Sequence, residues 1–134
     1  MGESENIEIV KKGYDAFLRG DVDTLLAMFT DDIEWQLDRN EKVPFTGVRH
    51  GKEEVGDFFR MVNEFQQPLE FETREYIAQG DKVVALGHSA WSVKPTHQTY
   101  ETDFAEVFTI RDGKVARFRE YADTHAASEA YKAM

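Results

Sequence analysis

Two glutamates interrupt the apolar pattern of two neighbouring segments near the C-terminus. In residues 99–110, apolar and aromatic side chains recur at alternate positions, and Glu106 falls on that same side. Glu120 falls on the apolar side of residues 114–123 in the same way. Because an unpaired charge among aromatic side chains is costly, each carboxyl group must find a partner or take up a proton. The two residues are therefore candidates for an acid and a base that act together.

The turn between these segments decides whether the two glutamates meet. A two-residue turn at residues 112–113 would pair Phe108 with Arg117 and set a core face opposite a charged face, so we reject that register. A three-residue turn that begins one residue earlier restores the match between the faces. It makes Glu106 and Glu120 diagonal neighbours on one face, with backbones about 7–8 Å apart.

Two carboxylates so placed in a poorly solvated site repel each other, and this repulsion raises at least one pKa. Proteins keep an acid and a base side by side near neutral pH in this way. Each glutamate alone could instead lie at a sheet edge, extend to solvent, or pair with an arginine from elsewhere in the chain.

Other side chains are candidates for the same pocket. His88 lies in residues 82–93, where both faces carry apolar side chains, so it is either a pocket residue that orients a water or donates to an oxyanion, or a satisfied core histidine. Trp35 lies on an inward strand face, where it either contacts a ligand as part of the pocket wall or belongs only to the hydrophobic core. Tyr14 lies on the apolar stripe of a helix, where its hydroxyl either points into the cavity or reaches the surface. The predicted lining also includes Phe59, Phe104 and Phe118.

The composition excludes several classes of protein. The 134 residues carry 26 acidic against 16 basic side chains, a formal charge of -10, and this excess repels nucleic acid and anionic membranes. The sequence has no Cys, no pair of His at ligand spacing, no phosphate-binding glycine loop and no G-x-S-x-G motif, so we expect no metal and no cofactor. Apolar stretches are far shorter than the roughly 20 residues of a membrane span. With no export signal, the expected location is the cytoplasm.

The order of elements predicts how these side chains are positioned. Hydrophobic content of 41%, with 10 Phe, 5 Tyr and 2 Trp, supplies one core, so residues 1–134 are expected to form a single domain. Periodicity and breaker residues predict helices at about 4–19, 22–29, 52–65 and 124–133, and strands at about 33–37, 69–79, 82–94, 98–110 and 114–123. Helices followed by hairpin-linked strands indicate an α+β fold, in which the helices cover one face of a curved, mostly antiparallel sheet around an apolar pocket.

Several of these segments resemble a known family. The segments on which the resemblance rests are GDVD at 20–23, LLAMFTDDIEW at 25–35, FTG at 45–47, HGKEEV at 50–55, VFTIRDGKV at 107–115 and REYADT at 119–124. Over nearly the whole chain the sequence is similar to SnoaL-like proteins of the NTF2-like superfamily, whose fold relatives include ketosteroid isomerases, polyketide cyclases and limonene-epoxide hydrolases. The resemblance implies a cone-shaped, helix-lined cavity and usually a homodimer.

The resemblance also implies roles for the polar candidates. Glu106 matches the position of the oxyanion-hole aspartic acid in ketosteroid isomerases, the general example of a carboxylic acid kept neutral in an apolar site. Glu120 resembles the aspartate in the closing strand of limonene-epoxide hydrolases. His88 lies on the strand that carries their other catalytic carboxylate, so that half of their apparatus is not reproduced. No residue near Trp35 matches the general-base aspartate of the isomerases.

These observations lead to two hypotheses about function. The first is a cofactor-independent enzyme that acts on a small, largely apolar carbonyl or epoxide compound by acid/base proton transfer through Glu106 and Glu120. The alternative is a non-catalytic domain of the same fold that binds a small hydrophobic molecule or serves for dimerisation. We also expect a homodimer through the outer sheet face, where the pattern sets the side chains of Trp91, Val107, Val115 and Tyr121 beside charges.

Overall fold

The structure is a computed structural model that describes residues 2–132 of the chain. The helices are α1 (Glu3–Leu18), α2 (Val22–Ala27), α3 (Gly51–Phe65) and α4 (Thr124–Tyr131). The strands are β1 (Phe29–Leu37), β2 (Gly47–His50), β3 (Gln66–Gln79), β4 (Lys82–Val93), β5 (Gln98–Arg111) and β6 (Lys114–Ala122). The predicted last helix runs to residue 133, which lies outside the described residues.

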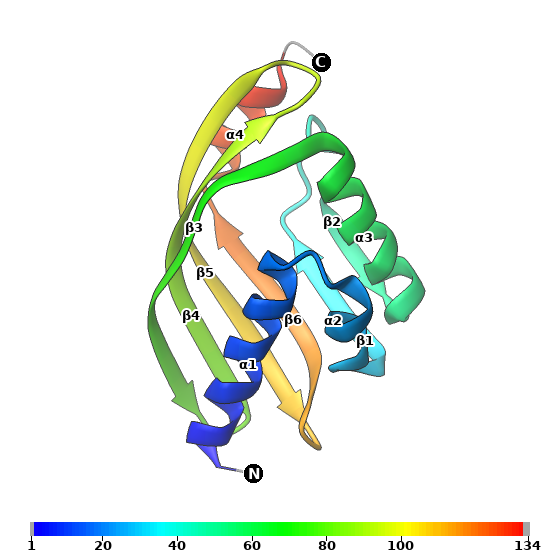
Figure 1. Ribbon diagram of the computed structural model, residues 1–134, viewed down its shortest axis with the longest axis vertical. Helices are drawn as coiled ribbons and strands as arrows, with labels where there is room; N and C mark the ends of the chain where they lie inside the picture. The colour runs from blue at the N-terminus through cyan, green and yellow to red at the C-terminus, as the bar shows by residue number, and fades with distance from the viewer. Residues whose placement is uncertain (1, 133–134) are drawn as a thin grey trace.

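The six strands form one curved, unclosed sheet in the order β2-β1-β6-β5-β4-β3. β1 and β6 run parallel, whereas the other neighbouring strands are antiparallel. Figure 1 shows that the long strands curve like a shell and that the helices lie over its concave face. This arrangement confirms the predicted α+β fold with helices on one face of a mostly antiparallel sheet.

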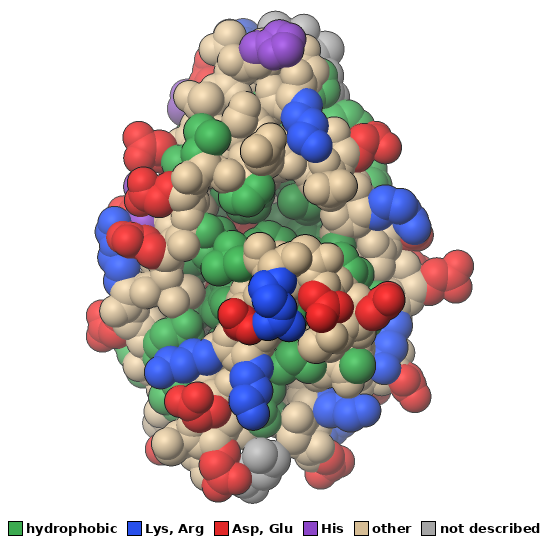
Figure 2. Space-filling model, viewed as in Figure 1, with side chains coloured by type: hydrophobic (Ala, Val, Ile, Leu, Met, Phe, Trp, Pro, Cys, Tyr) green, Lys and Arg blue, Asp and Glu red, His purple; other side chains and the backbone are tan. Residues whose placement is uncertain are grey.

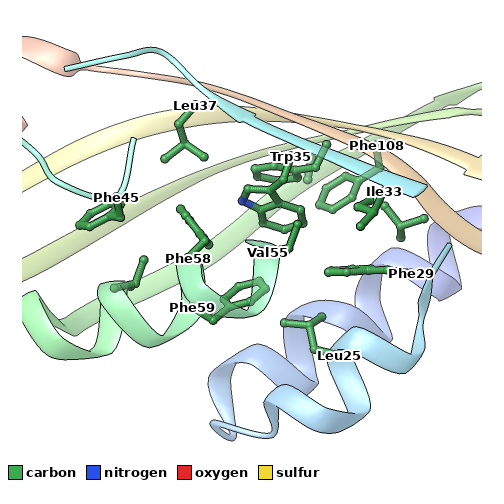
Figure 3. Close-up of a cluster of buried hydrophobic side chains, with 14 of the residues drawn as sticks. Leu25, Phe29, Ile33, Trp35, Leu37, Phe45, Val55, Phe58, Phe59 and Phe108 are labelled. Atoms are coloured by element: carbon green, nitrogen blue, oxygen red, sulfur yellow. The ribbon is translucent and has the colours of Figure 1, made fainter. Parts of the chain in front are cut away.

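Short-range signals explain where the helices begin and end. The first helix ends before Gly20, which has the left-handed φ of 72° that glycine adopts without strain. The side chain of Asp21 accepts a hydrogen bond from the Thr24 amide and so caps α2. Phe58 and Phe59 in α3 are buried against the sheet, and Figure 3 shows both pointing toward Trp35 of β1. The helices are thus amphipathic elements that close the concave side.

The hairpin between β5 and β6 differs from the prediction. Arg111 pairs with Lys114, so the turn has two residues, and both of these, Asp112 and Gly113, have the positive φ values of a type I′ turn (52° and 79°). The faces are matched instead by a β-bulge at Ala116, which pairs with no residue of β5. The predicted three-residue turn is therefore wrong, because the one-residue offset lies within the strand.

Two other segments differ from the sequence pattern. Phe29, expected to end the second helix, begins β1 and is 2% exposed. Residues 39–51, for which the sequence predicted neither helix nor strand, contain the four-residue strand β2, which pairs with the end of β1, for example Arg49 with Trp35. β2 adds one more strand to the edge of the sheet beside the pocket.

Candidate active site

An apolar cavity of about 140 Å³ lies between the concave face of the sheet and helices α1, α3 and α4. Figure 2 shows its opening as a hollow lined largely by hydrophobic side chains. An engineered protein cavity of about 150 Å³ holds benzene, so this space suits a ligand of about one ring, with any further groups reaching toward the opening. No Lys, Arg or His side chain of residues 2–132 lines the cavity. The lining therefore favours a neutral ligand over an anion.

The aromatic side chains named from the sequence line this cavity. Trp35 stacks on Phe118 with ring centroids 3.8 Å apart, and the edge of Phe59 contacts the same indole. Phe104 stacks on Phe71 on the opposite wall. The four predicted aromatic residues, Trp35, Phe59, Phe104 and Phe118, are only 4–6% exposed. The walls are therefore packed aromatic surfaces.

The two glutamates face each other on the concave wall. Glu106 of β5 pairs directly with Glu120 of β6, whereas the predicted diagonal arrangement placed Glu120 two residues away from the position opposite Glu106. Each carboxyl group is close enough to shift the pKa of the other. From α1, the Tyr14 hydroxyl donates a hydrogen bond of 2.5 Å to Glu106 Oε1. A helix and two strands thus bring a hydroxyl and two carboxyl groups together.

The environment of this trio favours one bound proton. Burial, the charge of Glu120 and the hydrogen bond between the carboxyl groups raise the pKa of Glu106 well above its ordinary value, against the opposing effect of the Tyr14 hydroxyl. Burial also raises the pKa of Glu120, while the hydrogen bond from Glu106 acts the other way. Burial raises the pKa of Tyr14 too, with the charge of Glu106 adding to the effect. The arrangement therefore favours a proton on Glu106 over a proton on Glu120.

The two carboxyl groups differ in their access to the cavity. Glu106 is 6% exposed, whereas Glu120 is half-buried, and both side chains line the cavity. Asp38 lies at the cavity wall, and its charge contributes to the raised pKa of Glu120. Arg119 holds Asp38 in an ion pair at 2.6 Å. Glu120 is therefore the carboxyl group better placed to meet a ligand.

His88 lies outside the pocket. Its side chain is on the outer face of β4, where Nδ1 is 2.8 Å from Asp103 and Nε2 is 2.9 Å from Glu101. These two carboxylates raise its pKa. The prediction that His88 assists in the pocket is therefore wrong, because the inward face of β4 is the one that carries Ser89 and Trp91.

The predicted outer face also needs correction. Trp91 (8% exposed) and Val115 (3% exposed) belong to the core and line the cavity. Of the four side chains named for this face, Val107 and Tyr121 remain on it, and Tyr121 is 50% exposed. Val115 turns inward because the bulge at Ala116 shifts the alternation of β6 by one residue.

Several polar lining residues were missed by the sequence analysis. They include Asp38, Gln66, Ser89 and Tyr100. Asp38 continues the alternation of β1 as an outward position, and Gln66 stands at a helix–strand junction where no periodicity applies. The only available signal was for Ser89 and Tyr100, which share inward faces with Trp91 and with Glu106, respectively.

Among residues 2–132, no group of three or more His, Asp or Glu side chains is placed to hold a metal ion. In the same part of the chain, every helix is too short or too polar to cross a membrane.

Comparison with known proteins agrees with this geometry. Residues 10–118 match the SnoaL-like domain family. The chain belongs to this family. An NTF2-like protein from Burkholderia xenovorans LB400 is 34% identical, with 98% of each chain covered and a TM-score of 0.90. The SnoaL-like chain is therefore similar to a solved structure over nearly its full length.

Two other solved structures extend the comparison. TerC, co-crystallised with polyporic acid, is 28% identical over 96% of this SnoaL-like chain and 98% of its own, with a TM-score of 0.82. A Bacillus subtilis protein with a provisional isomerase name is 20% identical over 100% of this chain and 98% of its own, with a TM-score of 0.85. At that identity the second likeness supports the fold alone. No curated protein matches the sequence.

Proposed function

We propose that this SnoaL-like protein is a cofactor-independent enzyme that transfers protons on a small, neutral, largely apolar carbonyl or epoxide compound. The observation that carries the proposal is the direct cross-strand pairing of Glu106 and Glu120 on the wall of an aromatic cavity. Pairs of titratable groups whose surroundings separate their pKa values commonly divide the roles of acid and base.

The proposed roles follow from burial and contacts. Glu106 is the acid, because it is the more deeply buried carboxyl group and its pKa is raised well above the ordinary value. Glu120 is the base, because its interaction with Glu106 acts to lower its pKa and its side chain is the less buried of the two. Tyr14 holds the acid in place through its hydrogen bond to Oε1. Tyrosine and a neutral carboxylic acid form the oxyanion hole of ketosteroid isomerases in the same chemical combination.

For a carbonyl substrate, the ionised Glu120 removes a proton from the carbon next to the carbonyl group. The Glu106 proton then turns from Glu120 to the carbonyl oxygen, where negative charge develops. Glu120 then returns a proton to carbon while the enol oxygen returns its proton to Glu106, which completes an isomerisation or exchange and restores both carboxyl groups. For an epoxide, Glu120 removes a proton from an attacking water and Glu106 gives its proton to the ring oxygen. Both reactions use Glu106 as the acid and Glu120 as the base.

The experiment uses acetophenone and styrene oxide as probes. Deuterium uptake from deuterium oxide into the methyl group of acetophenone, or diol formation from styrene oxide, is followed by NMR. Glu106→Gln and Glu120→Gln should each lower the rate by about a hundredfold or more. The exposed Glu75 supplies the matched control, Glu75→Gln, which should leave the rate unchanged. Near-normal rates in both pocket variants would rule out the acid/base roles.

A non-catalytic binding domain is the second candidate, and the predominance of apolar side chains in the lining favours it. TerC, a relative at 28% identity, was crystallised with polyporic acid, which supports small-molecule binding within this fold. Native mass spectrometry separates the two candidates. A ligand that remains bound to the purified protein, and that is recovered unchanged after incubation, would favour binding over catalysis.

A further inference from the structure

One N–H donor in the cavity wall has no acceptor. Trp35 is 6% exposed and lines the cavity, and its indole Nε1 is a buried atom without a hydrogen-bond partner among residues 2–132. The other described residues with a buried, unpaired side-chain atom do not line the cavity; they are Asn6, Thr30, Arg49 and Arg119. Because an unpaired buried donor is costly, an acceptor atom on a bound ligand would stabilise this site.

The chain has two tryptophans, and they differ in this respect. Trp91 is 8% exposed and also lines the cavity, but its indole N–H donates to Ser89 Oγ at 3.0 Å. An indole N–H is a donor with no acceptor capacity, so Trp35 needs an acceptor from elsewhere. The fold thus satisfies one indole from within the chain and leaves the other in the wall of a space that suits a ligand.

Aromatic contacts fix the direction of the Trp35 ring. The indole stacks on Phe118 with ring centroids 3.8 Å apart, and the Phe58 centroid lies 5.6 Å away. Figure 3 shows the nitrogen on the side of the indole toward Phe58 and Leu37 and away from Phe108. Phe58 and Leu37 line the cavity, so the N–H is directed along the cavity wall.

This direction leads toward the carboxyl pair. Trp35 pairs with Phe118 in the parallel register of β1 and β6. Glu120 lies two residues further along β6, as Leu37 does along β1, and both line the cavity. With about 3.3 Å per residue along a strand and about 4.8 Å between strands, the backbones at Trp35 and Glu120 are about 8 Å apart. Both side chains extend over the same face, so a ligand of about one ring can contact both.

The proposed reaction needs a donor at this place. Negative charge develops on the substrate oxygen, and a carbonyl oxygen has two lone pairs for hydrogen bonds. Glu106 supplies one donor. The Tyr14 hydroxyl does not supply the second, because it already donates to Glu106 Oε1 at 2.5 Å. The indole N–H of Trp35 is the unpaired donor in the described lining that remains.

We propose that the Trp35 indole N–H donates a hydrogen bond to the carbonyl or epoxide oxygen that receives the proton of Glu106. The inference rests on the proposed function, because it places a second donor on the same oxygen. Since Nε1 is buried, the oxygen reaches it as the neighbouring Phe58 ring turns aside. The assignment narrows the substrates to molecules whose reacting oxygen lies beside an apolar group that packs on these rings. A hydrocarbon of the same shape leaves the donor unpaired.

NMR of the indole N–H groups tests this hydrogen bond in the wild-type protein. The two tryptophans give two indole signals in a ¹H–¹⁵N spectrum, and Trp91→Phe assigns them by the loss of one. The probes are acetophenone and α-methylstyrene, which has a CH₂ group in place of the carbonyl oxygen. Acetophenone should move the Trp35 indole proton downfield, because a hydrogen bond to oxygen deshields it, whereas α-methylstyrene should not. The Trp91 proton, bonded to Ser89, should respond alike to both probes.

Affinities measured by calorimetry give a second readout. Trp35→Phe keeps an aromatic ring beside Phe118 but removes the donor. It should weaken acetophenone roughly fivefold more than α-methylstyrene, the effect of one hydrogen bond. Trp91→Phe is the matched control, because it removes an indole whose N–H is already paired, and it should leave the ratio of the two affinities unchanged.

The outcomes separate this inference from the acid/base proposal. Equal shifts of the Trp35 proton with both probes, no shift with bound acetophenone, binding of neither probe, or an unchanged affinity ratio in folded Trp35→Phe overturns the hydrogen bond. Deuterium uptake by acetophenone without the Trp35 shift keeps the proposed reaction and rejects the role of Trp35. The shift without deuterium uptake supports the hydrogen bond and counts against the reaction.

Discussion

The pH dependence of stability offers a direct test of the proton held by the carboxyl pair. Glu106 is 6% exposed, and its pKa is raised first by burial and then by the charge of Glu120. Glu106→Gln replaces the neutral acid with an amide of the same shape. The amide oxygen still accepts the hydrogen bond from Tyr14, and the amide nitrogen still donates to Glu120. The substitution therefore removes the titration while it keeps the contacts.

The sign of the effect follows from proton binding in the two states. The unfolded chain loses the glutamate proton near pH 4.3, whereas the folded chain keeps it to higher pH. Between these two pKa values the folded state binds about one more proton, so the free energy of unfolding falls by about 1.4 kcal/mol per pH unit. Above the folded-state pKa the free energy of unfolding has lost this contribution in full and no longer changes with pH on its account. Glu106→Gln should lack most of this slope, and its stability relative to the wild type should rise across the window.

Urea unfolding followed by circular dichroism between about pH 4 and pH 8 measures this slope. Glu75→Gln, a substitution at an exposed position, controls for the general loss of one negative charge. Carboxyl chemical shifts from NMR give the pKa of each glutamate directly. Parallel stability curves for the wild type and Glu106→Gln, together with ordinary or lowered pKa values for both Glu106 and Glu120, would refute the shared proton and the acid/base mechanism with it.

Three further predictions concern the rest of the sheet. A Cβ atom at Gly87 would lie 2.4 Å from the Phe104 ring and 2.3 Å from the Glu72 carbonyl oxygen, so Gly87→Ala should lower the free energy of unfolding by about 1–3 kcal/mol in urea titrations. The pKa of His88 is raised by Asp103 and Glu101, so its stabilising effect should be present below the unfolded value near 6.5 and disappear as pH rises through the folded pKa. His88→Asn should therefore destabilise the fold at low pH more than at high pH, with no change in the deuterium-uptake rate. Homodimerisation through the outer face predicts a dimer mass in sedimentation equilibrium, and Tyr121→Glu on that face should shift it toward the monomer.

Alternation along a strand was enough to place Glu106. Its neighbours at alternate positions of β5 are aromatic or apolar, and one buried face was the only arrangement consistent with them. The same reasoning could not orient His88, because β4 carries apolar side chains on both of its faces and is flanked by long strands on both sides. In such a strand the side chains of the outer face are also partly covered, and composition does not distinguish the faces.

Gln66 shows a different limit of the sequence. It stands where α3 passes directly into β3, so neither the helical nor the strand period determines its direction. Its burial depends on Tyr100 from β5 and Tyr131 from α4, which are 34 and 65 residues away in the chain. A polar side chain that becomes buried through such distant contacts has no local signal. Finding it required the tertiary structure.

The register of β6 shows how a bulge and a site can depend on each other. Val115 and Phe118 are three residues apart, so they lie on opposite faces of a regular strand, yet both are buried, at 3% and 4% exposed. Only an extra residue between them allows this, and the structure places Ala116 there as the bulge. The type I′ turn at residues 112–113 fixes the start of pairing, and the bulge then brings Glu120 opposite Glu106. Since two apolar residues at odd spacing after an Asp-Gly turn already require such an offset, the sequence contained the information for the direct pair, and the error lay in assigning the offset to the turn.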